Sequence, residues 1–164
     1  FALDNLWDGL GAILIDNHHL KYLFGKVTMY PHFNQKARNM ILYFLKRHFS
    51  DDDHLVTPVD PANIDFHQDE MKKIFRGWRY KENYKILSRE VRNLNENIPP
   101  LINAYMNLSP TMKTFGTFIN HKFGDVEETG IMITLKDIYV EKINRHLSSY
   151  KKDFEIRWFS HENQ

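Results

Sequence analysis

The chain has 164 residues, of which 42% are hydrophobic and 26% charged, a balance that is typical of one folded domain and excludes a disordered polypeptide. Its 22 basic and 21 acidic side chains give a net charge of +1, which argues against a dedicated nucleic-acid-binding protein. The absence of cysteine excludes disulfides, thiol nucleophiles and thiolate metal sites.

The first two predicted elements are a helix and a strand. Apolar residues recur with helical spacing from Leu3 to Leu14, and Asn17 offers a stop because asparagine tolerates the left-handed conformation. The segment from Lys21 to Tyr30 is rich in aromatic and β-branched residues, which predicts a strand that Pro31 ends.

Two helices are predicted next, on either side of a polar loop. Asn34 is suited to cap the first of them. Its apolar face comprises Ala37, Met40, Ile41, Phe44 and Leu45. The loop opens with the polar turn 51–53 and continues as an extended piece. The second helix runs from Met71 and places Trp78 on its apolar face, although Gly77 interrupts the pattern.

A charged helix is predicted from Tyr80 to Asn95, with one apolar side and a solvated back. Pro99 and Pro100 end that pattern and start a new helix. Pro100 suits a helix start because its missing N–H is not needed there and its φ is already helical. The new apolar face comprises Leu101, Ile102, Tyr105 and Met106.

The remaining elements are strands and one helix. Strands are predicted over 114–120 and 130–135, and a helix over 137–147. The alternation of Phe154, Ile156 and Trp158 predicts a final strand. Strands and helices alternate irregularly, so we expect a single α+β domain with a mixed central sheet flanked by helices.

The sequence holds no motif typical of a resident metal or nucleotide. His18 and His19 are adjacent, whereas helical metal ligands stand three or four residues apart. The pair Gly9-x-Gly11 lies inside a helical pattern, where close packing explains it better than phosphate binding. There is no P-loop and no dinucleotide-binding fingerprint. We therefore expect no metal and no permanently bound cofactor.

Two groups of residues have chemistry that allows a function. The first comprises the acidic residues Asp125, Glu127 and Glu128, which we expect in a turn between two strands. They either accept a proton from an amine nucleophile or are simply solvated. The second is a basic–aromatic patch that either contacts a polyanion or membrane headgroups or places its rings in the core. It comprises Lys72, Lys73, Arg76, Trp78, Arg79, Tyr80 and Lys81.

Several segments resemble, in order, the hemolysin-like branch of the GNAT acyltransferase superfamily, which includes the N-acyltransferases of ornithine- and glycine-lipid synthesis. They are "LDNLWDGLGAIL" (3–14), "YLFGKVTMYPHFNQKARNMILYFLKRHF" (22–49), "LVTPVDP" (55–61), "IPPLINAYMNL" (98–108) and "FGDVEETGIMITLKDI" (123–138). The resemblance covers about residues 3–147. The chain departs from it at 25–30, where the family reads "GPVSIS", and in the acidic stretch 122–129.

The resemblance implies a GNAT reaction, in which an amine attacks an acyl thioester. The donor, acyl-CoA or the phosphopantetheine of acyl-carrier protein, would be a co-substrate. Its pyrophosphate would lie at a helix N-terminus, with Asn5 nearby. Residues 23–29 would form the second of two splayed strands that hold the thioester. The resemblance also implies Tyr30 as the acid for the leaving thiolate, and Glu127 or Glu128 beside the acceptor amine.

The resemblance further implies that the chain, residues 1–164, is the distal half of a longer protein. It opens with Phe1 rather than methionine, and the first donor-site strands would precede it. We expect an N-acyltransferase that acylates an amino acid for aminolipid synthesis, with this piece inactive alone. The alternative is a non-catalytic module that binds lipid headgroups or acyl-carrier protein. We expect a cytoplasmic protein, peripheral to the inner membrane through Lys72, Lys73, Arg76 and Arg79.

Overall fold

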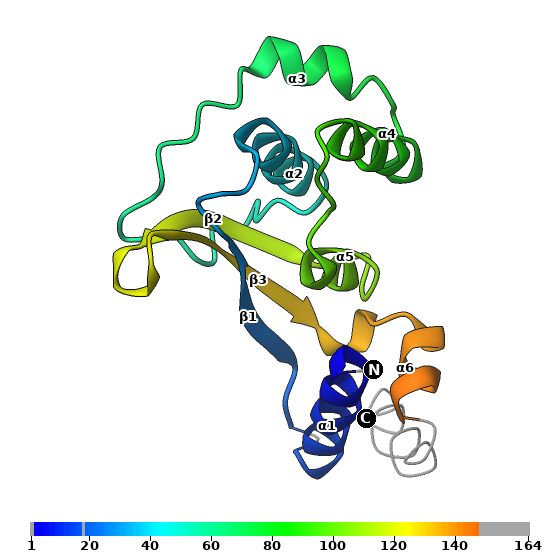
Figure 1. Cartoon of the computed structure of the whole chain (residues 1–164). Coiled ribbons are helices and arrows are strands. Elements are labelled where there is room, and N and C mark those ends of the chain that lie inside the picture. The colour runs from blue at the N-terminus through cyan, green and yellow to red at the C-terminus, as the bar shows by residue number, and fades with distance from the viewer. Residues whose placement is uncertain (1, 18, 148–164) are drawn as a thin grey trace.

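The computed structural model describes residues 2–17 and 19–147, and for 2–7, 15 and 145–147 it describes the backbone only. The helices in this part are α1 (Ala2–Asp16), α2 (Gln35–His48), α3 (Gln68–Ile74), α4 (Tyr80–Asn93), α5 (Pro100–Met106) and α6 (Val140–Leu147). The strands are β1 (Tyr22–Met29), β2 (Lys113–Asn120) and β3 (Val126–Thr134). Short 3₁₀ turns at His121–Phe123 and Leu135–Asp137 flank β3 (Figure 1). The expected α+β class is confirmed.

The three strands form one antiparallel sheet in the order β1-β3-β2. The register pairs Tyr22 with Thr134 at one end of β1 and Met29 with Glu127 at the other. β1 is therefore an edge strand among the described residues. The prediction of a strand at 21–30 is confirmed, and the sheet agrees with part of a GNAT-like fold.

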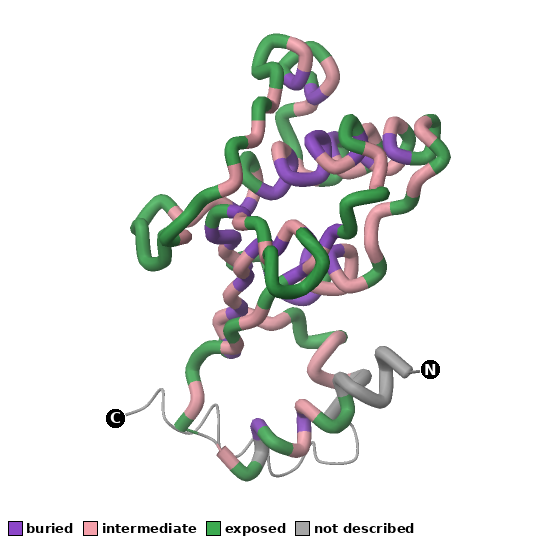
Figure 2. Tube along the Cα trace, turned by 60° about the vertical axis from the view of Figure 1, so that its left-hand side comes forward, coloured by how far each residue is buried: buried purple, intermediate pink, exposed green. Residues whose placement is uncertain are grey.

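The core lies between one face of this sheet and four helices. Buried apolar side chains from β1, β3, α2, α3, α4 and α5 form one continuous cluster. Figure 2 shows the buried residues gathered along these helices and strands. The largest fully buried side chains include Phe44 and Ile41 on α2 and Ile131 on β3. Helix α2 thus joins the sheet to the outer helices, and it packs directly on α4.

The start of α2 is fixed by a cap that the sequence predicts. The side chain of Asn34 accepts hydrogen bonds from the backbone N–H groups of Lys36 (3.0 Å) and Ala37 (3.1 Å). Its own N–H donates to Glu96, which follows α4, at 2.9 Å. This bond ties the N-cap of α2 to the segment that follows α4.

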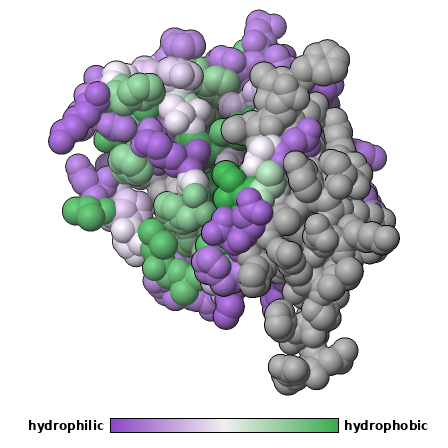
Figure 3. Space-filling model, turned by 90° about the horizontal axis from the view of Figure 1, so that it is seen from below, coloured by the Kyte–Doolittle hydropathy of each residue, from purple (hydrophilic) through white to green (hydrophobic). Residues whose placement is uncertain are grey.

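The other face of the sheet carries no described helix of its own. Phe24 on β1 is 64% exposed and stacks on the buried Phe115 with ring centroids 5.6 Å apart. Both rings lie over Gly130, where a Cβ atom would meet Phe115 at 3.3 Å. Helix α1 packs on α6 beyond the end of the sheet where β1 begins. The view from below in Figure 3 shows hydrophobic side chains exposed on part of the described surface.

The structure corrects three sequence predictions. β3 begins at Val126, not at Gly130, because the acidic residues before Gly130 pair with β1 and extend the ladder. α3 ends at Ile74, so Trp78 lies outside any helix and does not enter the core. The last described helix begins at Val140, not at 137, because a 3₁₀ turn precedes it. The strand expected at Phe154, Ile156 and Trp158 lies outside the described residues.

Among the described residues, none of the helices combines the length and the apolar character needed to cross a bilayer.

Candidate functional site

The end of β1 brings together three of the residues that the resemblance implicates. Thr28 and Met29 pair with Glu128 and Glu127 in the antiparallel ladder. Tyr30 follows β1 directly, at this same end of the sheet. Residues that are almost one hundred positions apart therefore meet because β3 returns beside β1. The acidic pair belongs to the central strand rather than to a turn.

Glu127 faces the helical layer, where Arg38 of α2 meets it. The Nη1 atom of Arg38 donates to Oε1 of Glu127 at 2.5 Å, and both side chains are largely shielded from water. Oε2 of Glu127 is buried and has no hydrogen-bond partner. This carboxylate therefore keeps one oxygen for a further hydrogen-bond donor.

Glu128 faces the opposite side of the sheet, because successive side chains of a strand alternate. It is 1% exposed, and both its oxygens accept hydrogen bonds from the Nζ atom of Lys26, at 2.6 and 2.7 Å. Glu127 and Glu128 therefore cannot serve one bound amine together. Glu127 is the better candidate for contact with an acceptor amine, because one of its oxygens has no partner. Both oxygens of Glu128 already accept hydrogen bonds from Lys26.

Tyr30 and Asn5 do not complete this site in the described structure. Tyr30 is 54% exposed, and its ring stacks on His32 with centroids 5.7 Å apart. Asn5 belongs to α1, which precedes the opposite end of β1, and its side chain lies outside the described part. The structure therefore brings Tyr30 to the same sheet end as the acidic pair but does not bring Asn5 there.

A second tyrosine, which the sequence placed only on an apolar helix face, lies over the middle of β1. The hydroxyl oxygen of Tyr105 on α5 is 3.4 Å from the position that a Cβ atom at Gly25 would take. Burial raises the pKa of the Tyr105 phenol, which keeps the phenol protonated. The sequence feature that points to Tyr105 is Pro100, which starts the short helix that carries this tyrosine.

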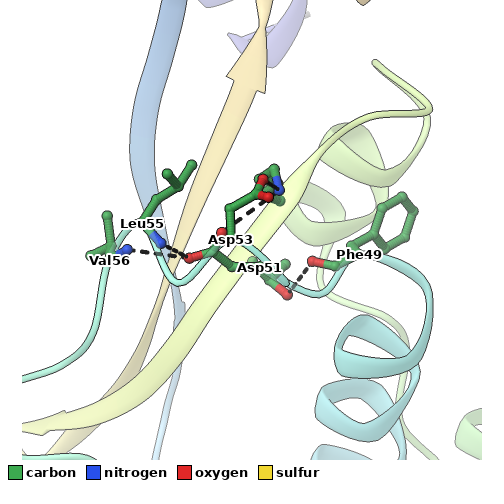
Figure 4. A network of polar contacts seen from close by, with 7 residues as sticks. Phe49, Asp51, Asp53, Leu55 and Val56 are labelled. Carbon is green, nitrogen blue, oxygen red and sulfur yellow. Dashed lines mark hydrogen bonds and ion pairs between the residues drawn. The ribbon is translucent and has the colours of Figure 1, made fainter.

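A largely apolar cavity of about 450 Å³ lies between α2, the loop 50–66 and strands β2 and β3. Asp51 orders the start of this loop, because its carboxylate accepts hydrogen bonds from the backbone N–H groups of Leu55 (2.6 Å) and Val56 (3.2 Å) (Figure 4). The Oγ1 atom of Thr114 on β2 donates to the carbonyl of Phe49 at 2.9 Å, which ties the end of α2 to the sheet.

The basic–aromatic patch divides into a buried and an exposed part. Burial, with the nearby Tyr84 and Tyr139, raises the pKa of Tyr80 to about 12, and its ring packs among Phe44, His48, Phe49 and Tyr84. Trp78 is 95% exposed in the turn between α3 and α4. The cations of the patch are all exposed: Lys72, Lys73, Arg76, Arg79 and Lys81.

Within residues 2–17 and 19–147, no group of three histidine or acidic side chains is arranged to hold a metal ion.

Two relatives are similar to almost the whole chain. A protein named glycine N(alpha)-acyltransferase from Bacteroides thetaiotaomicron is 55% identical over 150 residues, which are 92% of this chain and 44% of that protein. A protein of the same name from Phocaeicola vulgatus is 55% identical over 152 residues, or 93% and 47%. The chain thus spans less than half the length of these curated relatives. No protein-family model and no solved structure matches it. The identity supports an acyltransferase family.

Proposed function

We propose that this chain is part of an N-acyltransferase that transfers a fatty acyl group from a thioester to the amine of glycine. The observation that carries the proposal is the 55% identity to two proteins named glycine N(alpha)-acyltransferase, over more than nine-tenths of the chain. The acyl donor is acyl-carrier protein or acyl-CoA, and the product is an aminolipid precursor. The hemolysin-like branch of the GNAT superfamily is the proposed family.

The sheet supports this proposal because, among the described residues, one edge of β1 pairs with no other strand, and the resemblance implies that the thioester lies along this strand. In the proposed reaction, Glu127 first takes one proton from the ammonium group through its free oxygen, which leaves a neutral amine. The amine nitrogen then attacks the carbonyl carbon, the C–S bond breaks, and a tyrosine hydroxyl gives its proton to the leaving thiolate. The second proton that the nitrogen loses on forming the amide restores this hydroxyl, for which Tyr30 and Tyr105 are the two candidates.

The test uses the parent protein, which is the longer polypeptide of which this chain is proposed to be a part. Purified parent is incubated with glycine and a radiolabelled acyl thioester, on acyl-carrier protein and on coenzyme A in parallel. We expect N-acylglycine with at least one donor. Formation of no acylated amino acid with either donor, by a protein that is folded by circular dichroism, would refute the function.

The two tyrosines are distinguished by removing one hydroxyl at a time. If Tyr105 is the acid, Tyr105→Phe lowers kcat by about 10²–10⁴-fold, the usual range for general acid catalysis, while Tyr30→Phe changes it little. The reverse result assigns the role to Tyr30. Tyr84→Phe is the matched control, because it also removes one partly buried tyrosine hydroxyl, which donates to Asn103. Equal, small effects of all three variants would exclude a tyrosine acid.

The alternative function is contact with a lipid surface through the basic–aromatic patch. It is favoured by Trp78, because an indole that is 95% exposed among cations is suited to the interface of an anionic membrane. Such contact would also place the enzyme peripherally at the inner membrane, where its acylated product inserts. Acyl transfer and membrane contact are compatible in one protein.

Vesicle co-sedimentation tests this contact. We expect the parent to bind vesicles that contain anionic lipid, and the variant Arg76→Gln/Arg79→Gln to bind them less, with a further loss for Trp78→Ala. Lys85→Gln/Arg92→Gln on the exposed side of α4 is the charge-matched control. Equal binding by both double variants would refute a specific patch.

A further inference from the structure

A polar pocket next to the candidate site has the chemistry to hold an amino acid. It has a volume of about 420 Å³ and lies between the first turns of α2, the start of α3 and the loop at 63–67. Most of its lining side chains are polar, and they include Lys36, Arg38, Asn39, Asp65 and Glu70. It is connected to the end of β1 through the ion pair between Arg38 and Glu127.

Asn39 provides the unused polar atom of this pocket. The residue is 8% exposed, and its Nδ2 atom donates to the carbonyl of Asp65 at 3.1 Å. That bond fixes the orientation of the amide, because a flipped amide would place two oxygens against each other. The Oδ1 atom is then left buried and without a hydrogen-bond partner. A buried acceptor of this kind requires an N–H or O–H donor.

The charges around Asn39 are balanced. Lys36 pairs with Glu70 at 2.7 Å, and Asp65 lies 3.2 Å from the Nδ1 atom of His67. Arg38 uses Nη1 on Glu127 and keeps further N–H groups for other acceptors. A pocket for a phosphate or another simple anion would carry an excess of cations. The two cations Lys36 and Arg38 and the two carboxylates of Asp65 and Glu70 fit a molecule that carries both signs.

We infer that this pocket binds the acceptor as a zwitterionic amino acid. Oδ1 of Asn39 accepts a hydrogen bond from the ammonium group, and Lys36 and Arg38 attract the carboxylate. The inference rests on the proposed function, since that function supplies glycine as the acceptor. It goes beyond that function because it locates the acceptor between α2 and the loop 63–67. This pocket lies on the helical side of the sheet, and Glu127 faces the same side. The volume leaves room for glycine with bound water.

Steady-state kinetics on the parent protein test the role of Asn39. We expect Asn39→Ala to raise KM for glycine at least tenfold, because a hydrogen bond to a charged group is lost. KM for the acyl donor should stay unchanged. Asn93→Ala on the exposed side of α4 is the matched control. An unchanged KM for glycine in a folded Asn39→Ala variant overturns the inference while the function stands.

A substitution at the exposed edge of the pocket tests the same inference without altering a buried residue. Lys36 is half-exposed, so Lys36→Gln leaves the core intact. We expect it to raise KM for glycine severalfold but to leave KM for glycinamide, which lacks the carboxylate, unchanged. Lys85→Gln serves as its control. Equal effects of Lys36→Gln on both acceptors contradict carboxylate recognition in this pocket.

A binding measurement separates the two proposals. If the wild-type parent forms no N-acylglycine, the proposed function fails, and ¹³C-glycine is titrated by NMR without an acyl donor. Saturable binding that Asn39→Ala weakens supports the pocket without the reaction. Absence of saturable binding overturns the pocket as well.

Discussion

Lys26 and Glu128 form an ion pair whose two side chains differ greatly in their exposure to solvent. Glu128 is almost completely buried, whereas the side chain of Lys26 is 55% exposed. A buried carboxylate without its cation is costly, but a surface ammonium without its carboxylate is readily hydrated. The pair therefore serves mainly to neutralise Glu128, and the two deletions should differ in cost.

We predict that Lys26→Met destabilises the protein by about 1–3 kcal/mol, since it leaves Glu128 buried and unpaired. Glu128→Met should cost less than about 1 kcal/mol, because it removes the buried charge and lets Lys26 turn to water. Urea unfolding of both variants measures the difference. A larger loss for Glu128→Met than for Lys26→Met would show that the pair does not act through neutralisation.

His48, at the end of α2, is held in its neutral form. Burial, together with the neighbouring Arg47, lowers its pKa below the usual 6.5. Nδ2 of the buried Asn83 lies 3.1 Å from Nε2 of His48, and it also donates to the carbonyl of Gly77 at 3.0 Å. Because an amide nitrogen can only donate, Nε2 must accept, which a protonated ring cannot do.

We predict that acid weakens the fold partly through His48. Its folded pKa lies below the unfolded value, so the unfolded chain binds the proton first as the pH falls. The contribution of His48 is thus fully present above pH 6.5 and is lost on further acidification. The fall in Tm between pH 7 and pH 5 should shrink in His48→Asn but not in His54→Asn, whose ring is exposed. Identical pH profiles for wild type and His48→Asn would contradict this.

At the scale of elements, the loop 50–66 depends on one carboxylate. The side chain of Asp51 is 7% exposed and accepts from two backbone N–H groups of the loop, and Nζ of Lys113 on β2 lies 3.7 Å away. The loop also pairs with β2, since the N–H of Ala62 donates to the carbonyl of Thr117 at 2.7 Å. These contacts hold the outer wall of the apolar cavity.

We predict that Asp51→Ala loosens this loop and costs about 1–3 kcal/mol, because two backbone donors lose their acceptor. The amides of Leu55 and Val56 should exchange with deuterium faster, while those of β3 keep their protection. Asp52→Ala, on the exposed side of the same turn, is the control. Unchanged exchange at Leu55 and Val56 would rule out Asp51 as the anchor.

For the protein as a whole, the most consequential feature is the edge of β1 that pairs with no strand among residues 2–17 and 19–147. Unpaired backbone N–H and C=O groups along a strand favour pairing with a further strand. The relatives extend well beyond the region they share with this chain. Under the proposed function, the first donor-site strands belong to a parent polypeptide and meet β1 at this edge.

We predict that residues 1–164 alone do not acylate glycine, since half the donor site would be missing. Co-expression with the upstream portion of the parent, as a separate chain, should restore part of the acyl transfer. The control is co-expression with an unrelated soluble domain. Robust turnover by residues 1–164 alone would refute the divided donor site.

The local helices and strands can be predicted from the amino-acid sequence alone. Apolar spacing predicted α1, α2 and α4, Asn34 marked the start of α2, and Pro100 marked the start of α5. The strand at 21–30 followed from its aromatic and β-branched residues. These features depend on neighbours within a few positions, so a single sequence is enough to read them.

The contacts between residues far apart in the chain became known from the three-dimensional structure. It extended β3 to Val126, separated Glu127 from Glu128 across the sheet, and paired them with Arg38 and Lys26. It also left Oδ1 of Asn39 without a partner. Strand register and burial decide such contacts, and both arise from packing between segments far apart in the chain, which local residue preferences do not encode.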